Sequence, residues 1–299
     1  MDVYAGDPTP TGLSLDARVG GSPFNVATGL ARLGRPTAWF GALSSDVLGQ
    51  RLDTALRTEG VNMVHALTVA APTTLSIVGL DANGSPSYSF HGEGCADRAI
   101  TIDDLPDLDE SVAAIHVGSF SMMVDPIGNA LLELVGREAD RRLISYDPNL
   151  RLMVQPDRDR WIQTITRMAG VAHLIKVSEE DLTELFPGDD PRSHIDRWLA
   201  SGASLVVLTQ GSKGAIAFTP EHKLAMPGVR AQVVDTVGAG DSFQAAMLAW
   251  LAESGLLAGP AIAALSEQQL GQMLTFAMSA AAITCSRRGA DLPFRRELP

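Results

Sequence analysis

The chain has 299 residues, of which 45% are hydrophobic and 19% charged, which is enough apolar content to bury one large α/β core. Its formal net charge of -12 repels polyanions, so we expect neither a nucleic acid nor a membrane surface as partner and favour a small ligand. The two cysteines, Cys95 and Cys285, indicate no disulfide framework and no metal-ligand spacing. Without a signal-peptide pattern, the sequence predicts a cytoplasmic protein.

Strand-like and helix-like segments alternate along the chain. Apolar strand candidates lie at 37–43, 113–120 and 143–147, and helical patterns lie at 46–60 and 127–141. This alternation predicts an α/β fold with a doubly wound, mostly parallel central sheet flanked by helices. Residues 73–91 differ, because Asn83-Gly84 separates two alternating runs as in a β-hairpin.

The apolar tract at 245–265 approaches the length of a membrane span. It contains Glu253, Gly255, Gly259 and Pro260, which predict two buried helical pieces instead. We find no repeat and no linker that would split the chain, so we expect one domain over 1–299.

The motif DTVGAGD, from Asp235 to Asp241, follows a short β-prone run and precedes an apolar helical pattern. Its small residues Gly238, Ala239 and Gly240 leave backbone N–H groups uncovered where the helix dipole favours an anion. Asp241 would stand beside a bound phosphate as a general base for an attacking hydroxyl. In isolation, the same residues would serve equally as helix caps and an ordinary turn.

A second glycine turn, Gly20-Gly21, delivers Asn25 into the first turn of an amphipathic helix. The glycines allow a ligand to approach the backbone closely, and an amide side chain can both donate to and accept from a sugar hydroxyl. Helix capping would use the same Asn25 side chain, so the sugar-binding interpretation depends on the other motif.

Together, GGSPFNVATGLARLG and DTVGAGDSFQAAML resemble the two signatures of the ribokinase-like (PfkB-type) carbohydrate kinase family. SYDPNLR at 145–151 and VVLTQGSKGAIAF at 206–218 are similar to further segments of that family, so the resemblance spans about 20–293. It implies an α/β sandwich with a small β lid, which we expect to be drawn from about 9–19 and 73–100. It also implies transfer of the γ-phosphoryl of ATP to a sugar or nucleoside hydroxyl.

The resemblance assigns roles to matched residues. On the catalytic side it implies Asp241 as base and the Gly238, Ala239 and Gly240 amides as stabilisers of the transferring group. The expected substrate-binding residues are Gly20, Gly21, Asn25, Arg151 and Asp241, with Asp147 and Asn149 as neighbours of Arg151. The expected nucleotide-binding residues are Ser178, Thr209, Gly211, Gly214, Gly238 and Gly240. A surface ion pair for Arg151 and a plain turn for the glycines are the competing interpretations.

Metal binding is the first departure from the family. Relatives carry an Asn-x-x-Glu motif that organises Mg²⁺, whereas KVSEEDL places Ser178 and Asp181 at those positions, with Glu179 or Glu180 as substitutes. We therefore assign Asp181 as the Mg²⁺ residue, and Asp235 matches a position that serves a monovalent cation such as K⁺ in relatives.

The start of the chain is the second departure. Relatives begin with an apolar strand that ends in a sugar-binding Asp, but before Gly12 we read no such strand. Either the start has been cut or misassigned, or the sheet closes differently. Asp2, Asp7 and Asp16 are weak replacements for that carboxylate, so we expect impaired sugar affinity.

The pattern is most similar to bacterial fructokinases, so fructose is the first substrate choice. A 2-keto-3-deoxygluconate kinase and a nucleoside kinase are alternatives, and a non-catalytic sugar-binding protein with this fold is an alternative of another class. Because relatives often pair through the lid, we also expect a homodimer.

Overall fold

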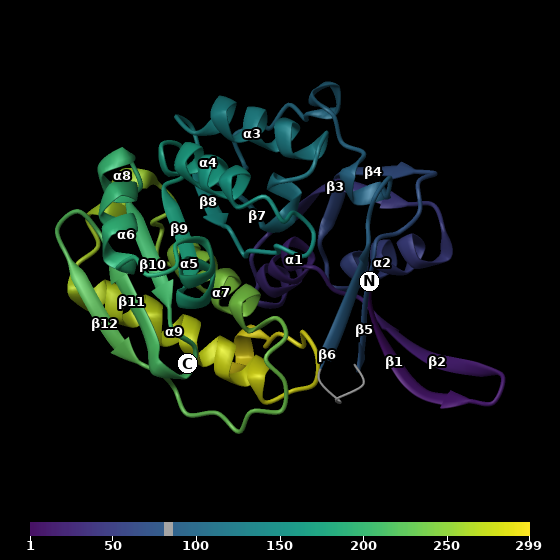
Figure 1. Cartoon of the computed structure of the whole chain (residues 1–299). Helices are drawn as coiled ribbons and strands as arrows, with labels where there is room; N and C mark the ends of the chain where they lie inside the picture. The colour runs from purple at the N-terminus through teal and green to yellow at the C-terminus, as the bar shows by residue number, and fades with distance from the viewer. Residues whose placement is uncertain (81–85) are drawn as a thin grey trace.

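The computed structural model describes residues 1–80 and 86–299, and within them the strands form sheets of six, four and two strands (Figure 1). The strands are β1 Asp2–Thr9, β2 Gly12–Arg18, β3 Ala38–Ser44, β4 Asn62–Val69, β5 Leu75–Leu80, β6 Pro86–His91, β7 Ala114–Gly118, β8 Leu143–Asp147, β9 Leu174–Ser178, β10 Leu205–Thr209, β11 Gly214–Phe218 and β12 Lys223–Pro227.

The six-stranded sheet has the order β12-β11-β10-β9-β8-β7, and its strands β7 to β10 run parallel. Strands β11 and β12 extend it in antiparallel fashion. This arrangement confirms the predicted α/β fold, and the expected strands at 113–120 and 143–147 are β7 and β8. The candidate at 37–43 became β3, which pairs in parallel with β4 in the two-stranded sheet.

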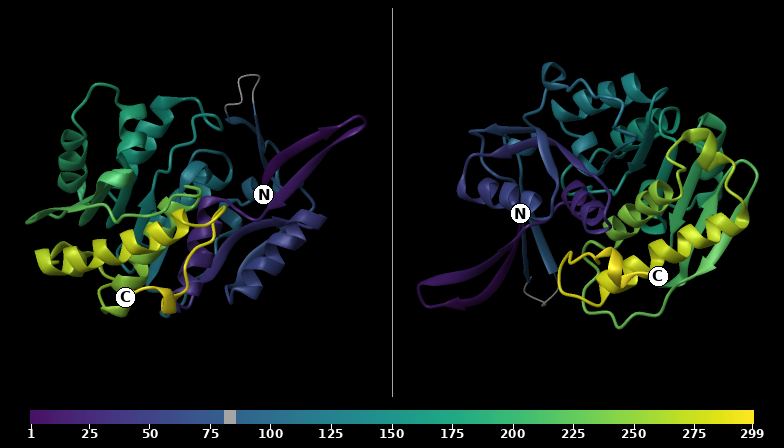
Figure 2. Two further views of the ribbon diagram at one scale, coloured as in Figure 1. Left: turned by 90° about the horizontal axis from the view of Figure 1, so that it is seen from below. Right: turned by 180° about the vertical axis from the view of Figure 1, so that it is seen from behind.

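Helices cover both faces of the six-stranded sheet, as the two views in Figure 2 show. The α-helices are α1 Ser22–Arg32, α2 Val47–Thr58, α3 Ile127–Glu138, α4 Arg158–Ala169, α5 Glu179–Leu185, α6 Pro191–Ser201, α7 Ala239–Glu253, α8 Gly259–Ala263 and α9 Glu267–Cys285. Short 3₁₀ turns occupy Ala96–Arg98, Ile102–Asp104, Ser119–Met122, Gly211–Lys213 and Arg295–Glu297. One buried cluster joins the sheet to α3, α4 and α6, and another joins it to α7, α8 and α9.

The apolar tract at 245–265 is divided between α7 and α8, as its Gly and Pro residues predict. Helix α7 is buried nearly all round, because it lies between the sheet, α1 and α9. Within the described residues, none of the helices is both long and apolar enough to cross a bilayer.

A four-stranded sheet with the order β2-β1-β5-β6 stands beside this body. The expectation that no strand precedes Gly12 is wrong, since β1 begins at Asp2 and pairs antiparallel with β2 and parallel with β5. Gly6 and Pro8 obscure the strand in the sequence, and its partners come from other parts of the chain. Strands β5 and β6 pair as a hairpin, whereas the predicted turn at Asn83-Gly84 lies outside the described residues.

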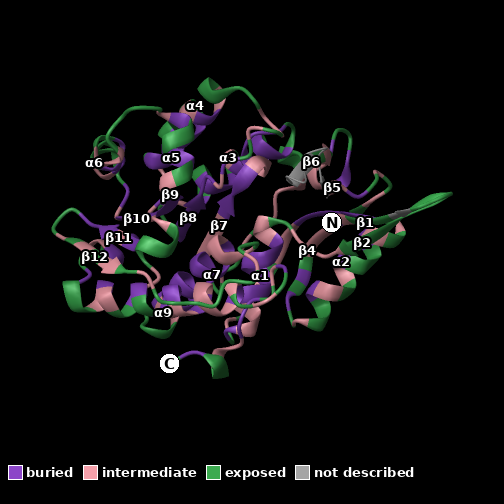
Figure 3. Ribbon diagram, turned by 60° about the horizontal axis from the view of Figure 1, so that its bottom comes forward, coloured by how far each residue is buried: buried purple, intermediate pink, exposed green. Residues whose placement is uncertain are grey.

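Helices α1 and α7 pack closely against each other. A side chain at Gly29 would place its Cβ 2.8 Å from Cβ of Ala245, so the contact requires a glycine there. This packing brings the N-terminal ends of both helices to the carboxyl ends of β7, β8 and β9 (Figure 3). Ligands of α/β proteins bind at that edge of a parallel sheet, so the fold locates the site.

Candidate active site

A cavity of about 1030 Å³ opens between the four-stranded sheet and the carboxyl ends of the parallel strands. Most residues predicted from the sequence line it. They are Gly20, Gly21, Asn25, Arg151, Ser178, Asp181, Thr209, Gly211, Gly238, Gly240 and Asp241. The predicted residues that are absent from its wall are Ala239, Gly214 and Asp235.

The Asp241 carboxylate lies in the first turn of α7 and accepts hydrogen bonds from α1. The Asn25 amide donates to Oδ2 over 2.8 Å, and the Ser22 hydroxyl donates to Oδ1 over 2.7 Å. Asn25 and Asp241 are both buried, with 6% of each residue exposed. The structure therefore brings the predicted base and the predicted sugar-binding amide into direct contact, and Asn25 orients Asp241.

Asn149 reaches the same carboxylate from the end of β8. Its amide lies 3.4 Å from Oδ1 of Asp241, and its backbone is left-handed with φ 41°. Ser119, at the end of β7, is also left-handed with φ 58°, and its hydroxyl donates to the Asn149 carbonyl over 3.4 Å. Such backbone conformations cost free energy for non-glycine residues and cluster at functional sites.

The N-terminus of α7 exposes bare backbone to the cavity. Gly238 is left-handed with φ 77°, and a Cβ there would lie 2.6 Å from Cβ of Ala290. A Cβ on Gly240 would lie 3.0 Å from Nζ of Lys176. The amide of Ala239 instead donates to the Thr236 carbonyl. Both positions of this glycine cradle therefore carry no side chain, Gly238 because of its left-handed backbone and Ala290, and Gly240 because of the approach of Lys176.

Lys176 and Asp147 form a buried ion pair behind this cradle. Nζ lies 2.9 Å from Oδ2 of Asp147, and the two side chains are 5% and 2% exposed. Burial raises the pKa of Asp147 to about 6, although the Lys176 charge opposes this shift. The pKa of Lys176 is raised because Asp147, Asp181 and Asp241 outweigh the effect of its own burial. A cation is therefore fixed beside the proposed phosphate position.

His116 on β7 adds a neutral polar group to the cavity wall. Burial and the nearby Lys176 charge lower its pKa to about 3, so the imidazole is uncharged at neutral pH. Its Nδ1 lies 3.2 Å from Oγ of Ser145, which also accepts a hydrogen bond from Gln244. The ring is thereby held in one orientation.

Asp2 lines the cavity beside the glycine turn. A Cβ on Gly20 would lie 2.1 Å from Oδ2 of Asp2, so only glycine permits this approach. Burial raises the pKa of Asp2, and the Arg151 charge lowers it. Arg151 itself donates from Nη1 to the Leu150 carbonyl over 2.7 Å. The carboxylate that the sequence left as a weak candidate thus lines the cavity.

The predicted nucleotide-side residues divide into two groups. Ser178 caps α5 by accepting from the Asp181 amide, and Thr209 ends β10 next to it in register. Both line the cavity together with Gly211. Gly214 begins β11, where a Cβ would lie 2.0 Å from the Met226 carbonyl oxygen, so it serves strand pairing.

The predicted metal residues are only partly free to bind. Oδ1 of Asp181 accepts the Leu150 amide, and Glu179 is bound to Gln210 and Lys213. Among the described residues, no group of three or more His, Cys, Asp or Glu side chains could hold a metal. Because Mg²⁺ commonly takes one or two carboxylates plus water and phosphate oxygens, Asp181 at the cavity wall fits that mode.

Asp235 lies outside the cavity and ties two loops together. Its Oδ1 accepts the Val237 amide over 3.1 Å, and its Oδ2 accepts the Gly289 amide over 2.8 Å. Each carboxylate oxygen keeps a lone pair that a cation would need.

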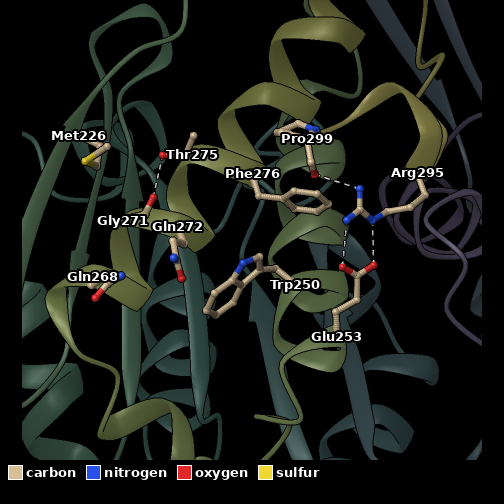
Figure 4. Close-up of a pocket in the computed structure, with 10 residues that line it drawn as sticks. All are labelled: Met226, Trp250, Glu253, Gln268, Gly271, Gln272, Thr275, Phe276, Arg295 and Pro299. Carbon is tan, nitrogen blue, oxygen red and sulfur yellow. Dashed lines mark hydrogen bonds and ion pairs between the residues drawn. The ribbon is translucent and has the colours of Figure 1, made fainter.

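A second pocket of about 620 Å³ lies between α7, α9 and the C-terminal segment (Figure 4). Arg295 pairs there with Glu253 and stacks on the ring of Phe276. The charged side chains of this pocket are therefore paired with each other. The main cavity, which contains Asp241 and the glycine cradle, holds the groups suited to chemistry.

A buried carboxylate beside a bare helix N-terminus, at the carboxyl edge of a parallel sheet, is the arrangement expected of a phosphoryl-transferring α/β enzyme. The model of a protein family described as "pfkB family carbohydrate kinase" matches residues 3–296 of this chain. This chain belongs to that family, whose members are phosphotransferases with a sugar hydroxyl as acceptor.

The relatives include a fructokinase of Rhizobium leguminosarum bv. trifolii, 40% identical over 251 residues that make up 84% of this chain and 77% of that protein. The structure of an ATP-bound fructokinase from Xylella fastidiosa matches with a TM-score of 0.86 and 27% identity, covering 100% of this chain and 92% of that one. A Vibrio cholerae O395 fructokinase with fructose, ADP and calcium matches with a TM-score of 0.79 and 25% identity, covering 97% and 91%.

Sequence reasoning passed over two residues of the site. Ser22 lies inside the quoted glycine motif, but a serine at a helix start is ordinarily a cap. Lys176 lies inside the apolar strand pattern of β9. A single lysine in a buried strand indicates a nearby carboxylate, because a buried charge needs a partner of opposite charge.

The Asp147 pKa predicts how stability depends on pH. A carboxyl with a folded-state pKa of about 6 and an unfolded value of 3.8 binds its proton more tightly when folded. Its contribution to the free energy of unfolding is therefore fully present below pH 3.8 and is lost as the pH rises to about 6. We expect the difference between wild type and Asp147→Asn to fall by about 2 kcal/mol between pH 4 and pH 7.

Urea unfolding at several pH values measures that difference. Asp109→Asn is a matched control, since the Asp109 pKa is lowered by hydrogen bonds to Ser111 and its difference from wild type should not fall over this range. A difference for Asp147→Asn that is flat or rises with pH would contradict the assignment.

Proposed function

We propose that this protein is an ATP-dependent fructokinase, which transfers the γ-phosphoryl of ATP to a hydroxyl of fructose. The observation that carries the proposal is Asp241, held by Asn25 at the mouth of a glycine cradle inside the main cavity. The fructokinase from Rhizobium and the fructose- and ADP-containing structure from Vibrio support fructose as the acceptor.

In the proposed reaction, the acceptor hydroxyl donates its proton to Asp241 as its oxygen attacks the γ-phosphorus. The bond from the γ-phosphorus to the bridging oxygen breaks, and ADP leaves. The N–H groups near Gly238 and Gly240 lie at the positive end of the α7 dipole and would stabilise the charge of the transferring group. Lys176, fixed beside Gly240, adds a positive charge behind it.

Nucleotide and metal sites follow from the same wall of the cavity. We assign ATP to the side formed by Ser178, Thr209 and Gly211, next to the cradle. Mg²⁺ would bind near Asp181, where it would neutralise phosphate charge. A monovalent cation such as K⁺ would bind near Asp235, whose two backbone hydrogen bonds order the loop before α7.

The first test is ATP consumption with Mg²⁺ over fructose, 2-keto-3-deoxygluconate, ribose, glucose and adenosine. We expect fructose to be turned over and Asp241→Asn to reduce kcat by about 10² or more, the scale for loss of a general base. Asp109→Asn, at an exposed carboxylate outside the cavity, serves as the comparison and should keep wild-type turnover. Sugar binding without turnover in wild type would contradict the kinase assignment and favour a non-catalytic sugar-binding protein.

A second substrate remains a candidate because of one observation. The guanidinium of Arg151 lines the cavity, and planar guanidinium groups bind carboxylates well. An acidic sugar such as 2-keto-3-deoxygluconate would use that group, whereas a nucleoside kinase has no comparable observation in its favour. Faster ATP consumption with the acidic sugar than with fructose in the same panel would identify the acidic sugar as the substrate.

Asp2 is the second proposed sugar contact. Its carboxylate lies against Gly20 and near Arg151, in the wall of the cavity. Asp2→Asn is expected to raise KM for fructose about tenfold, the scale of one hydrogen bond to a charged group. Because Asp2 is not one of the three residues that hydrogen-bond to the Asp241 carboxylate, kcat should change less than KM. A change in kcat alone would place Asp2 outside the sugar site.

We propose that the four-stranded sheet, with its antiparallel pair β5 and β6, is the lid of the single domain over 1–299 and also the surface of a homodimer. Strand β2 is an edge of this sheet, and Leu13 and Leu15, which share one face, are 53% and 56% exposed. An edge strand with exposed apolar residues favours pairing with a second copy.

Sedimentation of wild type is expected to give a dimer, and the double variant Leu13→Ser, Leu15→Ser a monomer. Val64→Ser, at a residue that is 67% exposed on β4, is the matched control and should remain dimeric. A wild-type protein that sediments as a monomer would contradict the dimer.

A cytoplasmic location completes the proposal, since both cysteines are free thiols, and cell fractionation checks it.

A further inference from the structure

The three hydrogen bonds to Asp241 differ in how easily they can be broken. The Asn25 amide that donates to Oδ2 is buried, whereas the Ser22 hydroxyl that donates to Oδ1 is half-buried and lines the cavity. Ser22 is the first residue of α1, and its hydroxyl moves by rotation about a single side-chain torsion. The bond from Ser22 is therefore the one that a ligand can displace without moving backbone.

Oδ1 lies on the half-buried side of the carboxylate, and it is the oxygen that we assign to an incoming alcohol. Oδ2 faces the buried Asn25 amide, while Oδ1 faces the half-buried side of the site, where Ser22 donates over 2.7 Å and Asn149 over 3.4 Å. A carboxylate oxygen has two lone-pair positions, so both positions on Oδ1 are taken when these donors are in place. A sugar hydroxyl can donate to Oδ1 only if one donor leaves.

We propose that the Ser22 hydroxyl occupies on Asp241 the place of the acceptor hydroxyl, keeps water from that place while the sugar site is empty, and swings away when the sugar binds. The inference rests on the proposed function. It goes further because it makes Ser22 a positioning residue, which holds Oδ1 of Asp241 until the sugar binds and takes no part in the phosphoryl transfer itself.

Water is the competing acceptor that such a device would exclude. A water molecule bound to Oδ1 would give its proton to Asp241 while its oxygen bonds to the γ-phosphorus of ATP. The bond to the bridging oxygen would break, and ADP and phosphate would form. Because an alcohol hydroxyl from the chain already fills this position, water cannot take the place of the acceptor on Oδ1 while Ser22 is bound there.

Ser22→Ala removes the competing donor, and three quantities then change in a defined way. ATP hydrolysis without sugar should rise about fivefold, and KM for fructose should fall about fivefold, the scale of one net hydrogen bond. The kcat with saturating fructose should stay within about twofold of wild type, because Asn25 and Asn149 still hold Asp241. Ser22→Thr keeps the hydroxyl and should restore low hydrolysis and the wild-type KM.

Ser121→Ala is the matched control. Its hydroxyl also belongs to a half-buried serine at the cavity, but it donates to the Gly118 carbonyl and has no bond to Asp241. Sugar-free hydrolysis in this variant should equal that of wild type.

Several results would overturn the inference. These are a Ser22→Ala variant with unchanged hydrolysis and unchanged KM, one in which kcat falls while KM stays constant, or a Ser22→Thr variant that behaves like alanine. If Ser22→Ala does not fold, crystal structures of wild type with and without fructose decide. The Ser22 hydroxyl must leave Asp241 when fructose is bound, and a bond retained at hydrogen-bonding distance would refute the displacement.

Failure of the proposed function is distinguishable from failure of this inference. Wild type and Asp241→Asn are assayed in the same series. An inactive wild type refutes the kinase assignment. A wild type that phosphorylates fructose, together with Ser22 variants that change none of the three quantities, refutes only the role of Ser22.

Discussion

The contact between α1 and α7 is the constraint on which the site depends. The bare helix face at Gly29 lets the two helices approach closely, and their first turns then meet at one carboxylate, Asp241. Because Asn25 and Ser22 come from one helix and Asp241 from the other, any shift between the helices would change the orientation of the Asp241 carboxylate, the proposed base. Catalytic geometry is therefore coupled to core packing, and phosphoryl transfer depends strongly on positioning.

Electrostatics complete this arrangement. The cavity brings several carboxylates together at the carboxyl edge of the sheet, and a buried ion pair between Lys176 and Asp147 lies among them. A buried pair of this kind contributes little net stability, since desolvation opposes the attraction. The ion pair lies next to the Gly238 to Gly240 cradle, where Lys176 would fix one positive charge beside a bound phosphate. We therefore attribute to it a functional role and not a stabilising one.

The parts of the fold that depend on local pattern could be predicted from the sequence. The strands at 113–120 and 143–147 and the division of the tract at 245–265 follow from hydrophobic period and from Gly and Pro positions. Strand β1 was missed, because Gly6 and Pro8 weaken its pattern and its pairing comes from β2 and from β5, which is remote in sequence. The sequence also did not predict that β3 pairs with β4 outside the six-stranded sheet, because strand partners are set by tertiary packing.

The sequence by itself determined the family, and it supplied the proposals of an anion site at the start of α7 and of Asp241 as base, because each resides in a short contiguous motif. Only the tertiary structure decided how Asp241 is held, since its donors Ser22, Asn25 and Asn149 lie 219, 216 and 92 residues away along the chain. It also decided that Asp2 and Lys176 belong to the cavity. Contacts between remote segments follow from the packing of the whole core, and no local pattern encodes them.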